Sequence, residues 1–121
     1  MATIFVLDGN AAARERIAEC LKGRNHYVEA FASAAELEQV FGDLKPALIL
    51  LEAQLPDTDG FQWVRSLKEK WRIPVIFVTS RSSSAERIRG FEAGADDYVV
   101  KPFSPRELAV RAEAILRRYQ H

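Results

Sequence analysis

Features of secreted, membrane-spanning and nucleic-acid-binding proteins are scarce in this sequence. The single cysteine, Cys20, permits no internal disulfide, and its place in an apolar helical pattern predicts a small buried side chain. No run of about 18 apolar residues occurs, and the first residues lack the charged segment and long apolar stretch of a signal peptide. Seventeen basic residues balance seventeen acidic ones, so no net charge favours nucleic acid or a membrane surface. We therefore expect a cytoplasmic protein whose domain binds neither nucleic acid nor membrane.

What the sequence does contain is the composition of an ordinary globular domain. Hydrophobic residues make up 48% and charged residues 28% of the 121 positions. A chain of this size buries one core without disulfides or a structural metal. We therefore expect residues 1–121 to form a single domain.

Apolar runs and amphipathic patterns alternate along the whole chain. Short runs rich in β-forming residues predict buried strands at about 3–7, 27–31, 47–51, 74–78 and 97–100. Helical spacing of apolar residues predicts helices at about 11–22, 34–41, 60–71, 85–93 and 105–119. This alternation predicts an α/β fold with a parallel sheet, right-handed connections and helices on both faces. We interpret it as a flavodoxin-like (βα)5 three-layer sandwich.

A glycine lies inside the expected fourth helix. Gly90 interrupts the pattern of 85–93, and glycine in a helix interior costs about 1 kcal/mol relative to alanine. On that ground we expect the fourth helix to be a mobile element.

Polar residues follow four of the predicted strands. Glu52 ends the wholly apolar stretch 48–51 and precedes a turn-rich loop, while Asp8, Thr79 and Lys101 end the first, fourth and fifth strands. The carboxyl ends of parallel strands meet at one edge of the sheet, where α/β proteins bind ligands. We expect these four side chains to share a site; scattered capping and surface residues are the alternative.

The residue types at this edge favour phosphoryl or metal chemistry. Two carboxylates, a hydroxyl and an ammonium are present, whereas no histidine lies near them in the sequence. Acyl transfer is disfavoured because the set contains no pair of nucleophile and base.

These motifs resemble the receiver domain of response regulators over residues 3–119. Lys101-Pro102 is similar to the family's lysine followed by a cis proline, Thr79 to its phosphoryl-binding hydroxyl, and Tyr98 to its switch aromatic. The loop 55–60 and the segment 94–98 are further points of similarity. The resemblance implies the strand order 2-1-3-4-5. It also implies a phosphoacceptor pocket made of Asp8, Gly9, Glu52, Gln54, Thr79, Ser80 and Lys101.

Two positions depart from the receiver pattern where the chemistry would occur. Receivers carry a second acid after the first strand, where this chain has Gly9, and an acceptor aspartate, where it has Glu52. Mg²⁺ demands near-octahedral oxygen geometry, so we expect weak or absent Mg²⁺ binding and no cofactor. The longer side chain of Glu52 is misplaced for in-line attack and carries its charge towards Thr79 and Lys101. We expect Lys101 to pair with Glu52 or Asp8, and Glu52 partly to imitate a phosphorylated aspartate.

A second set of residues resembles the dimer interface of OmpR/PhoB-type receivers, the subfamily coupled to winged-helix DNA-binding domains. The resemblance implies a two-fold homodimer through the fourth helix, fifth strand and fifth helix. Ile88, Phe91 and Ala109 would form its apolar patch. Its ion pairs would join Arg87 to Glu107, Asp97 to Arg111 and Asp96 to Arg118. An ordinary solvated surface is the alternative.

The leading hypothesis is an atypical receiver domain that dimerises and signals without phosphorylation. It would be the N-terminal part of a transcriptional regulator whose output domain lies beyond residue 121, and it is not expected to be an enzyme. One alternative is a conventional Mg²⁺-dependent receiver in which Glu52 or a neighbouring acid such as Asp57 accepts the phosphoryl group. The other is a stand-alone adaptor whose fourth helix binds a different protein.

Overall fold

Five strands alternate with five helices across residues 2–119, the part of the chain that the computed structural model describes. The strands are β1 (Thr3–Leu7), β2 (Tyr27–Phe31), β3 (Leu48–Leu51), β4 (Val75–Thr79) and β5 (Asp97–Val100). The helices are α1 (Ala11–Lys22), α2 (Ala34–Phe41), α3 (Gly60–Lys70), α4 (Ser84–Ala93) and α5 (Pro105–Tyr119). All predicted elements are present, and their ends differ from the prediction by a single residue at most. None of the helices in this range combines the length and apolarity needed to cross a membrane.

The strands form one parallel sheet in the predicted order, β2-β1-β3-β4-β5. In the register, Leu7 pairs with Leu51, Leu51 with Phe77, and Thr79 with Val100. Because the strands run in one direction and end level with one another, the residues after β1, β3, β4 and β5 leave the sheet at the same edge. The chain order reverses between β1 and β3, which places a ligand-binding crevice at this edge.

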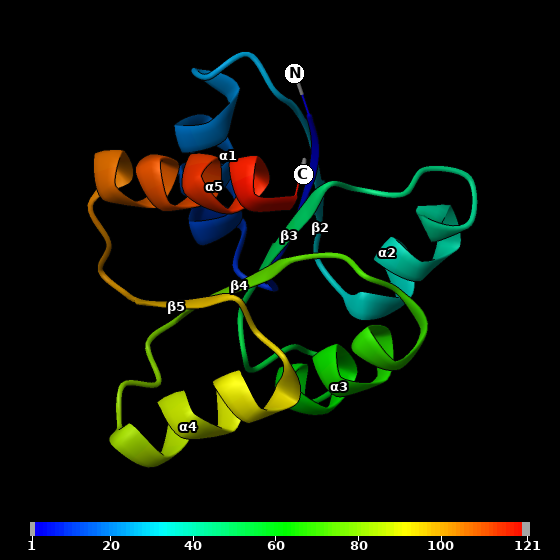
Figure 1. The fold of residues 1–121 in the computed structure, drawn as a ribbon, viewed down its shortest axis with the longest axis vertical. Helices are drawn as coiled ribbons and strands as arrows, with labels where there is room; N and C mark the ends of the chain where they lie inside the picture. Colours follow the sequence, from blue (N-terminus) through cyan, green and yellow to red (C-terminus); the bar gives the residue numbers. More distant parts are fainter. Residues whose placement is uncertain (1, 120–121) are drawn as a thin grey trace.

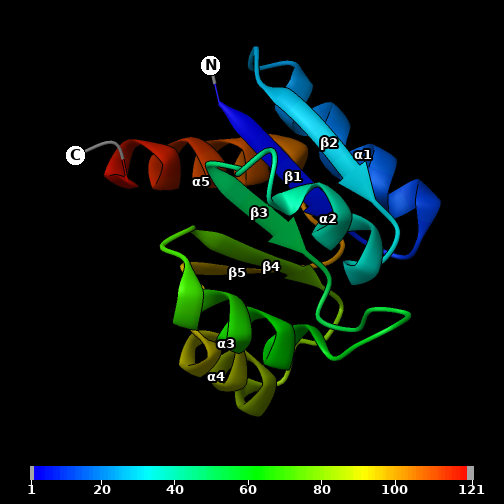
Figure 2. The same cartoon turned by 90° about the vertical axis from the view of Figure 1, so that its right-hand side faces the viewer.

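Helices cover both faces of the sheet and create two separate cores. In Figures 1 and 2, α1 and α5 lie on one face, and α2, α3 and α4 lie on the other. Alternate residues of β1 serve the two cores: Ile4 and Val6 pack under α1 and α5, whereas Phe5 and Leu7 pack under the other three helices. Each such buried side chain contributes about 1.5–3 kcal/mol to folding. The two cores hold the sheet rigid behind its polar edge.

Local hydrogen bonds fix the ends of the helices that border this edge. The Asn10 side chain accepts a 2.9 Å hydrogen bond from the Ala13 amide at the start of α1. The Asp59 carboxylate accepts one of 2.8 Å from the Phe61 amide at the start of α3. At the opposite edge of the sheet, Gly94 ends α4 with φ of +115°, a left-handed conformation that favours glycine.

Cys20 is less buried than the sequence predicted. Its side chain is only partly covered at the end of α1, and its thiol donates a 3.2 Å hydrogen bond to the Arg16 carbonyl. Cys20 therefore lies beside the core under α1 and α5, on the edge of the helical stripe rather than at its centre.

Candidate functional site

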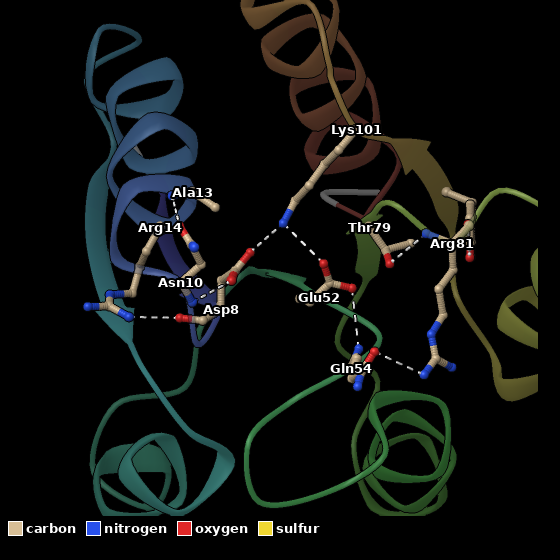
Figure 3. A network of polar contacts seen from close by, with 10 residues as sticks. Asp8, Asn10, Ala13, Arg14, Glu52, Gln54, Thr79, Arg81 and Lys101 are labelled. Carbon is tan, nitrogen blue, oxygen red and sulfur yellow. Dashed lines mark hydrogen bonds and ion pairs between the residues drawn. The ribbon is translucent and has the colours of Figure 1, made fainter.

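The carboxyl ends of four strands bring the predicted polar residues to one site (Figure 3). Asp8, Glu52 and Lys101 border a cavity of about 610 Å³, and Thr79 is fully buried at the end of β4. The remaining predicted pocket residues also line this cavity: Gly9, Gln54 and Ser80. Asp8, Glu52 and Lys101 therefore lie together as the sequence predicted, whereas Thr79 lies at the same edge of the sheet without lining the cavity.

Lys101 joins the two carboxylates of the site. Its ammonium nitrogen lies 2.8 Å from Oδ2 of Asp8 and 3.1 Å from Oε1 of Glu52 (Figure 3). Burial alone would lower the pKa of Lys101, but hydrogen bonds and the charges of the two carboxylates outweigh it, so the pKa is raised. The expected ion pair is confirmed, and it includes both acids. Lys101 is followed by the cis Pro102 that the resemblance implied.

Asp8 accepts hydrogen bonds from three donors. Besides Lys101, the Asn10 amide donates to Oδ1 over 2.9 Å, and Arg14 donates to the backbone carbonyl of Asp8 over 2.8 Å. Asp8 is buried, and these contacts satisfy its oxygens on the side of α1. The sequence prediction included Asp8 but not Arg14, which lies in the first turn of α1.

The side chains at this edge bear on whether the domain can hold Mg²⁺, the metal that receivers use. A magnesium ion needs near-octahedral coordination by oxygen. The oxygens of Asp8 and Glu52 that face each other both contact the ammonium of Lys101, and Gly9 supplies no side chain. Within residues 2–119, no group of three His, Cys, Asp or Glu side chains is arranged to hold a metal ion.

A short chain of hydrogen bonds leads from Glu52 across the mouth of the cavity. Oε2 of Glu52 accepts from the Gln54 amide over 3.3 Å, and the Gln54 side chain accepts from the Arg81 guanidinium over 3.3 Å. The Arg81 guanidinium also lies 3.6 Å from the Glu86 carboxylate on α4. Arg81 therefore connects the site to α4. The sequence prediction missed this residue, although its position directly after Thr79-Ser80 at a strand end was a usable signal.

Glu52 reaches one of the two groups it was expected to approach. Its carboxylate contacts Lys101, whereas the Thr79 hydroxyl accepts a 3.2 Å hydrogen bond from the backbone amide of Arg81. Thr79 thus anchors the loop after β4, which carries Arg81 over the cavity.

The predicted switch residue Tyr98 is buried beneath α4. Its hydroxyl donates a 2.7 Å hydrogen bond to the Arg81 carbonyl, and its side chain is 5% exposed. Burial raises the pKa of Tyr98, and the charges of Glu86 and Glu52 raise it further. Tyr98 and Thr79 therefore hold the same loop, one through the Arg81 carbonyl and the other through the Arg81 amide.

Asp57, the alternative acceptor, has a structural role at the start of α2. Its carboxylate accepts hydrogen bonds from the amides of Ala34 and Ala35 over 3.1 and 3.0 Å. These bonds, led by the one from Ala35, lower the pKa of Asp57. The residue caps α2 from the β3–α3 loop and does not belong to the cavity lining, which includes its neighbours Leu55 and Pro56.

The surface of α4 and α5 contains most of the residues predicted for a dimer interface. Ile88 and Phe91 are large apolar side chains with 57% and 49% exposure, and Arg87, Glu107 and Arg118 are also exposed. The prediction for Ala109 is wrong, because this residue is 3% exposed and faces the domain's own core from α5. The exposed apolar patch therefore consists of Ile88 and Phe91.

Two predicted interface acids already have partners within the chain. Both carboxylate oxygens of Asp97 accept from one nitrogen of Arg111, whose Nη1 lies 2.9 Å from Oδ2 and 3.1 Å from Oδ1. Asp96 accepts hydrogen bonds from Lys68, from the Val75 amide and from the Tyr119 hydroxyl, over 3.0, 2.9 and 2.7 Å. Their pairing with a second copy stays a prediction, and for Asp96 it must compete with three donors of its own chain.

Comparisons with known proteins agree with this architecture. A family model described as "Response regulator receiver domain" matches residues 4–113. The phosphate regulon transcriptional regulatory protein PhoB of Pseudomonas aeruginosa is 41% identical over 119 residues, which cover 96% of this chain and 52% of PhoB. The transcriptional regulatory protein ResD of Bacillus subtilis is 39% identical over 115 residues, covering 95% and 48%. The chain spans about half the length of these curated relatives.

Solved receiver structures superimpose on the whole domain. The BeF₃-activated receiver domain of DrrB has a TM-score of 0.90 and 32% identity, covering 98% of this chain and 99% of that one. A longer chain of DrrB, described as an OmpR/PhoB homologue from Thermotoga maritima, has a TM-score of 0.89 and 32% identity. The match covers 98% of this chain and 54% of the longer DrrB chain. With the family model, the relatives and the fold in agreement, the chain belongs to the response regulator receiver domain family and is of the OmpR/PhoB type.

Proposed function

We propose that this receiver domain is a phosphorylation-independent dimerisation and signalling module. Glu52 stands where receivers have an acceptor aspartate. The observation that carries the proposal is the contact of Glu52 with Lys101. A glutamate in this position keeps a negative charge next to Lys101 without any transfer reaction. One carboxylate carries about −1 against roughly −2 for a phosphoryl group, so the imitation is partial.

Phosphoryl transfer to Glu52 is disfavoured by position and by charge. The carboxylate extends one C–C bond further than that of aspartate, and a displacement of about 1 Å can slow a reaction ~100-fold. Phosphoryl transfer also needs positive charge beside the equatorial oxygens to neutralise their negative charge, and Mg²⁺ usually supplies it. We propose that Mg²⁺ binds weakly or not at all, because Lys101 occupies the space between the carboxylates of Asp8 and Glu52.

Transfer to Asp57 is disfavoured for a different reason. Both of its oxygens accept hydrogen bonds from the first amides of α2, which lowers its nucleophilicity and points it away from the cavity. A phosphoryl group on Asp57 would require α2 to lose these caps.

The output of the module is proposed to be a two-fold dimer through α4, β5 and α5. The exposed patch of Ile88 and Phe91, bordered by Arg87 and Glu107, supports this assembly. The relatives ResD and PhoB are transcriptional regulatory proteins, and this chain covers about half of the length of each. We therefore propose that the domain acts with a DNA-binding output domain and that it has no enzymatic activity of its own.

Intact mass spectrometry after incubation with acetyl phosphate and Mg²⁺ tests the proposal. We expect no phosphoryl adduct on the wild-type chain and an adduct on the double variant Gly9→Asp/Glu52→Asp. A Cβ at position 9 would lie 3.1 Å from Cδ of Pro56, so the Gly9→Ala variant serves as the steric control. A wild-type adduct that maps to Glu52 or Asp57 would overturn the proposal in favour of a conventional receiver.

A further inference from the structure

Gly90 of α4 lies directly against the ring of Tyr98. A Cβ atom at position 90 would be 2.8 Å from both Cδ2 and Cε2 of Tyr98, and 3.3 Å from Cδ2 of Phe77. Distances of 2.8 Å between carbon atoms are well below van der Waals contact. Tyr98 or α4 would therefore have to move if position 90 carried a side chain.

The reason for glycine at this position is space and not backbone conformation. Among the described residues, Gly94 is the glycine with a positive φ, and Gly90 continues the regular helix of α4. Alanine would suit that backbone better by about 1 kcal/mol of helix propensity. The sequence therefore gives up helix propensity at a place where the structure has no room for a methyl group.

Tyr98 is fixed on its other sides, so it cannot yield without consequences. Its ring centroid lies 5.9 Å from that of Phe77 and 6.2 Å from that of Phe91, and its hydroxyl is bonded to the Arg81 carbonyl. Phe77 belongs to the fully buried centre of β4. Moving the ring outward would break the hydrogen bond to Arg81 and push against Phe91.

We propose that Gly90 is a positioning residue: the missing side chain lets Tyr98 lie beneath α4, and this packing sets where α4 presents Ile88 and Phe91. The patch is thereby coupled to the loop of Thr79 and Arg81, because Tyr98 contacts Phe91 at one end and Arg81 at the other. The consequence for assembly rests on the proposed dimer, whereas the coupling of Gly90 to Tyr98 belongs to the single domain. The expectation that Gly90 makes α4 mobile is replaced by one in which it fixes the position of α4.

The variant Gly90→Ala tests the inference through the spectrum of Tyr98. With ¹³C-labelled tyrosine rings, the Tyr98 signals are assigned by Tyr98→Phe and report the ring currents of Phe77 and Phe91. We expect Gly90→Ala to shift these signals towards free-tyrosine positions and to lower the melting temperature. Gly42→Ala is the matched control, because a Cβ there has nothing within 4 Å and its φ of −66° suits alanine. Unchanged Tyr98 signals with a raised melting temperature in Gly90→Ala would overturn the inference.

A second variant keeps the inference testable if Gly90→Ala does not fold. Replacing the ring as well, in Gly90→Ala/Tyr98→Leu, removes the steric conflict and leaves the gain in helix propensity. We expect the double variant to melt at or above the temperature of Tyr98→Leu alone. If Gly90→Ala lowers the melting temperature by the same amount in the Tyr98→Leu background as in the wild type, a clash with Tyr98 is contradicted.

Sedimentation of the same variants separates this inference from the proposed function. If the wild type is a monomer at every concentration, the proposed dimer fails, yet the Tyr98 signals still decide the role of Gly90. If the wild type is a dimer, we expect Gly90→Ala to weaken association and Gly42→Ala to leave it unchanged. Wild-type association in Gly90→Ala, with displaced Tyr98 signals, would overturn the coupling of Gly90 to the patch.

Discussion

The ammonium nitrogen of Lys101 lies 3.1 Å from Oε1 of Glu52, the residue that stands where a receiver carries its acceptor aspartate. The same ammonium contacts Asp8 over 2.8 Å, so one positive charge serves two carboxylates. Without it, two negative charges would face each other at the end of a buried sheet. Lys101 therefore offsets the repulsion between the carboxylates of Asp8 and Glu52.

Replacing Lys101 by methionine should reduce stability. Breaking a buried ion pair by removing one partner costs about 3–5 kcal/mol, but the Lys101 side chain is 20% exposed and solvent screens part of the effect. We expect a loss of about 1–3 kcal/mol in the free energy of unfolding, measured by urea denaturation at neutral pH. Adding Glu52→Gln should recover part of this loss, since one unpaired carboxylate is removed. An unchanged midpoint in the single variant would contradict the importance of the pair.

Mg²⁺ should leave the thermal stability of the wild-type domain unchanged. A ligand that binds only the native state raises the melting temperature by mass action, so a constant melting temperature means negligible affinity. Differential scanning calorimetry across millimolar MgCl₂ measures this, with NaCl of equal ionic strength as the control. The double variant Gly9→Asp/Glu52→Asp should regain a saturable rise. A rise of several degrees in the wild type would disprove the expectation.

The cap that Asp57 provides should make stability depend on pH. Its pKa is lowered in the folded state, so its contribution is present above the unfolded pKa of about 3.9 and is lost as pH falls through the folded pKa. We expect Asp57→Ala to lower the free energy of unfolding by about 1 kcal/mol at pH 7, the usual effect of losing a helix cap. The difference from the wild type should vanish near pH 2. Asp43→Ala, at an exposed acid after α2, is the control and should be neutral at both pH values.

Much of the fold was predictable because local patterns determine it. The apolar run of β3 and the alternation of Ile4, Phe5, Val6 and Leu7 between two cores are visible in the sequence. The strand ends then placed Asp8, Glu52 and Lys101 together, since parallel strands share one edge. The convergence of these residues followed from the shared edge, whereas the strand order was taken from the resemblance to receiver domains.

The incorrect or missing predictions concern contacts between distant segments. Asp57 caps α2 from 22 and 23 positions away, which no local motif encodes. Ala109 was assigned to the surface from the resemblance, but the rotation of α5 turns it into the core. The expectation for Gly90 rested on helix propensity alone, and the close approach of the Tyr98 ring is visible only in the structure. Each of these features depends on tertiary packing, which local sequence patterns do not describe.

The last prediction concerns the dimer through α4, β5 and α5. We expect Phe91→Asp to abolish it, because the exposed patch of Ile88 and Phe91 must supply most of the affinity when rim ion pairs contribute only about 0–1 kcal/mol each. Arg111→Glu should weaken it. Adding Asp97→Arg in the same chain should partly restore association, since the exchange keeps opposite charges together both within a chain and across a two-fold axis.

Sedimentation equilibrium from micromolar to high-micromolar protein measures association. Val110→Asp, at an exposed apolar residue outside the predicted interface, is the control. A wild-type monomer throughout, or a dimer indifferent to Phe91→Asp, would rule out this interface and favour an adaptor that binds another protein through α4.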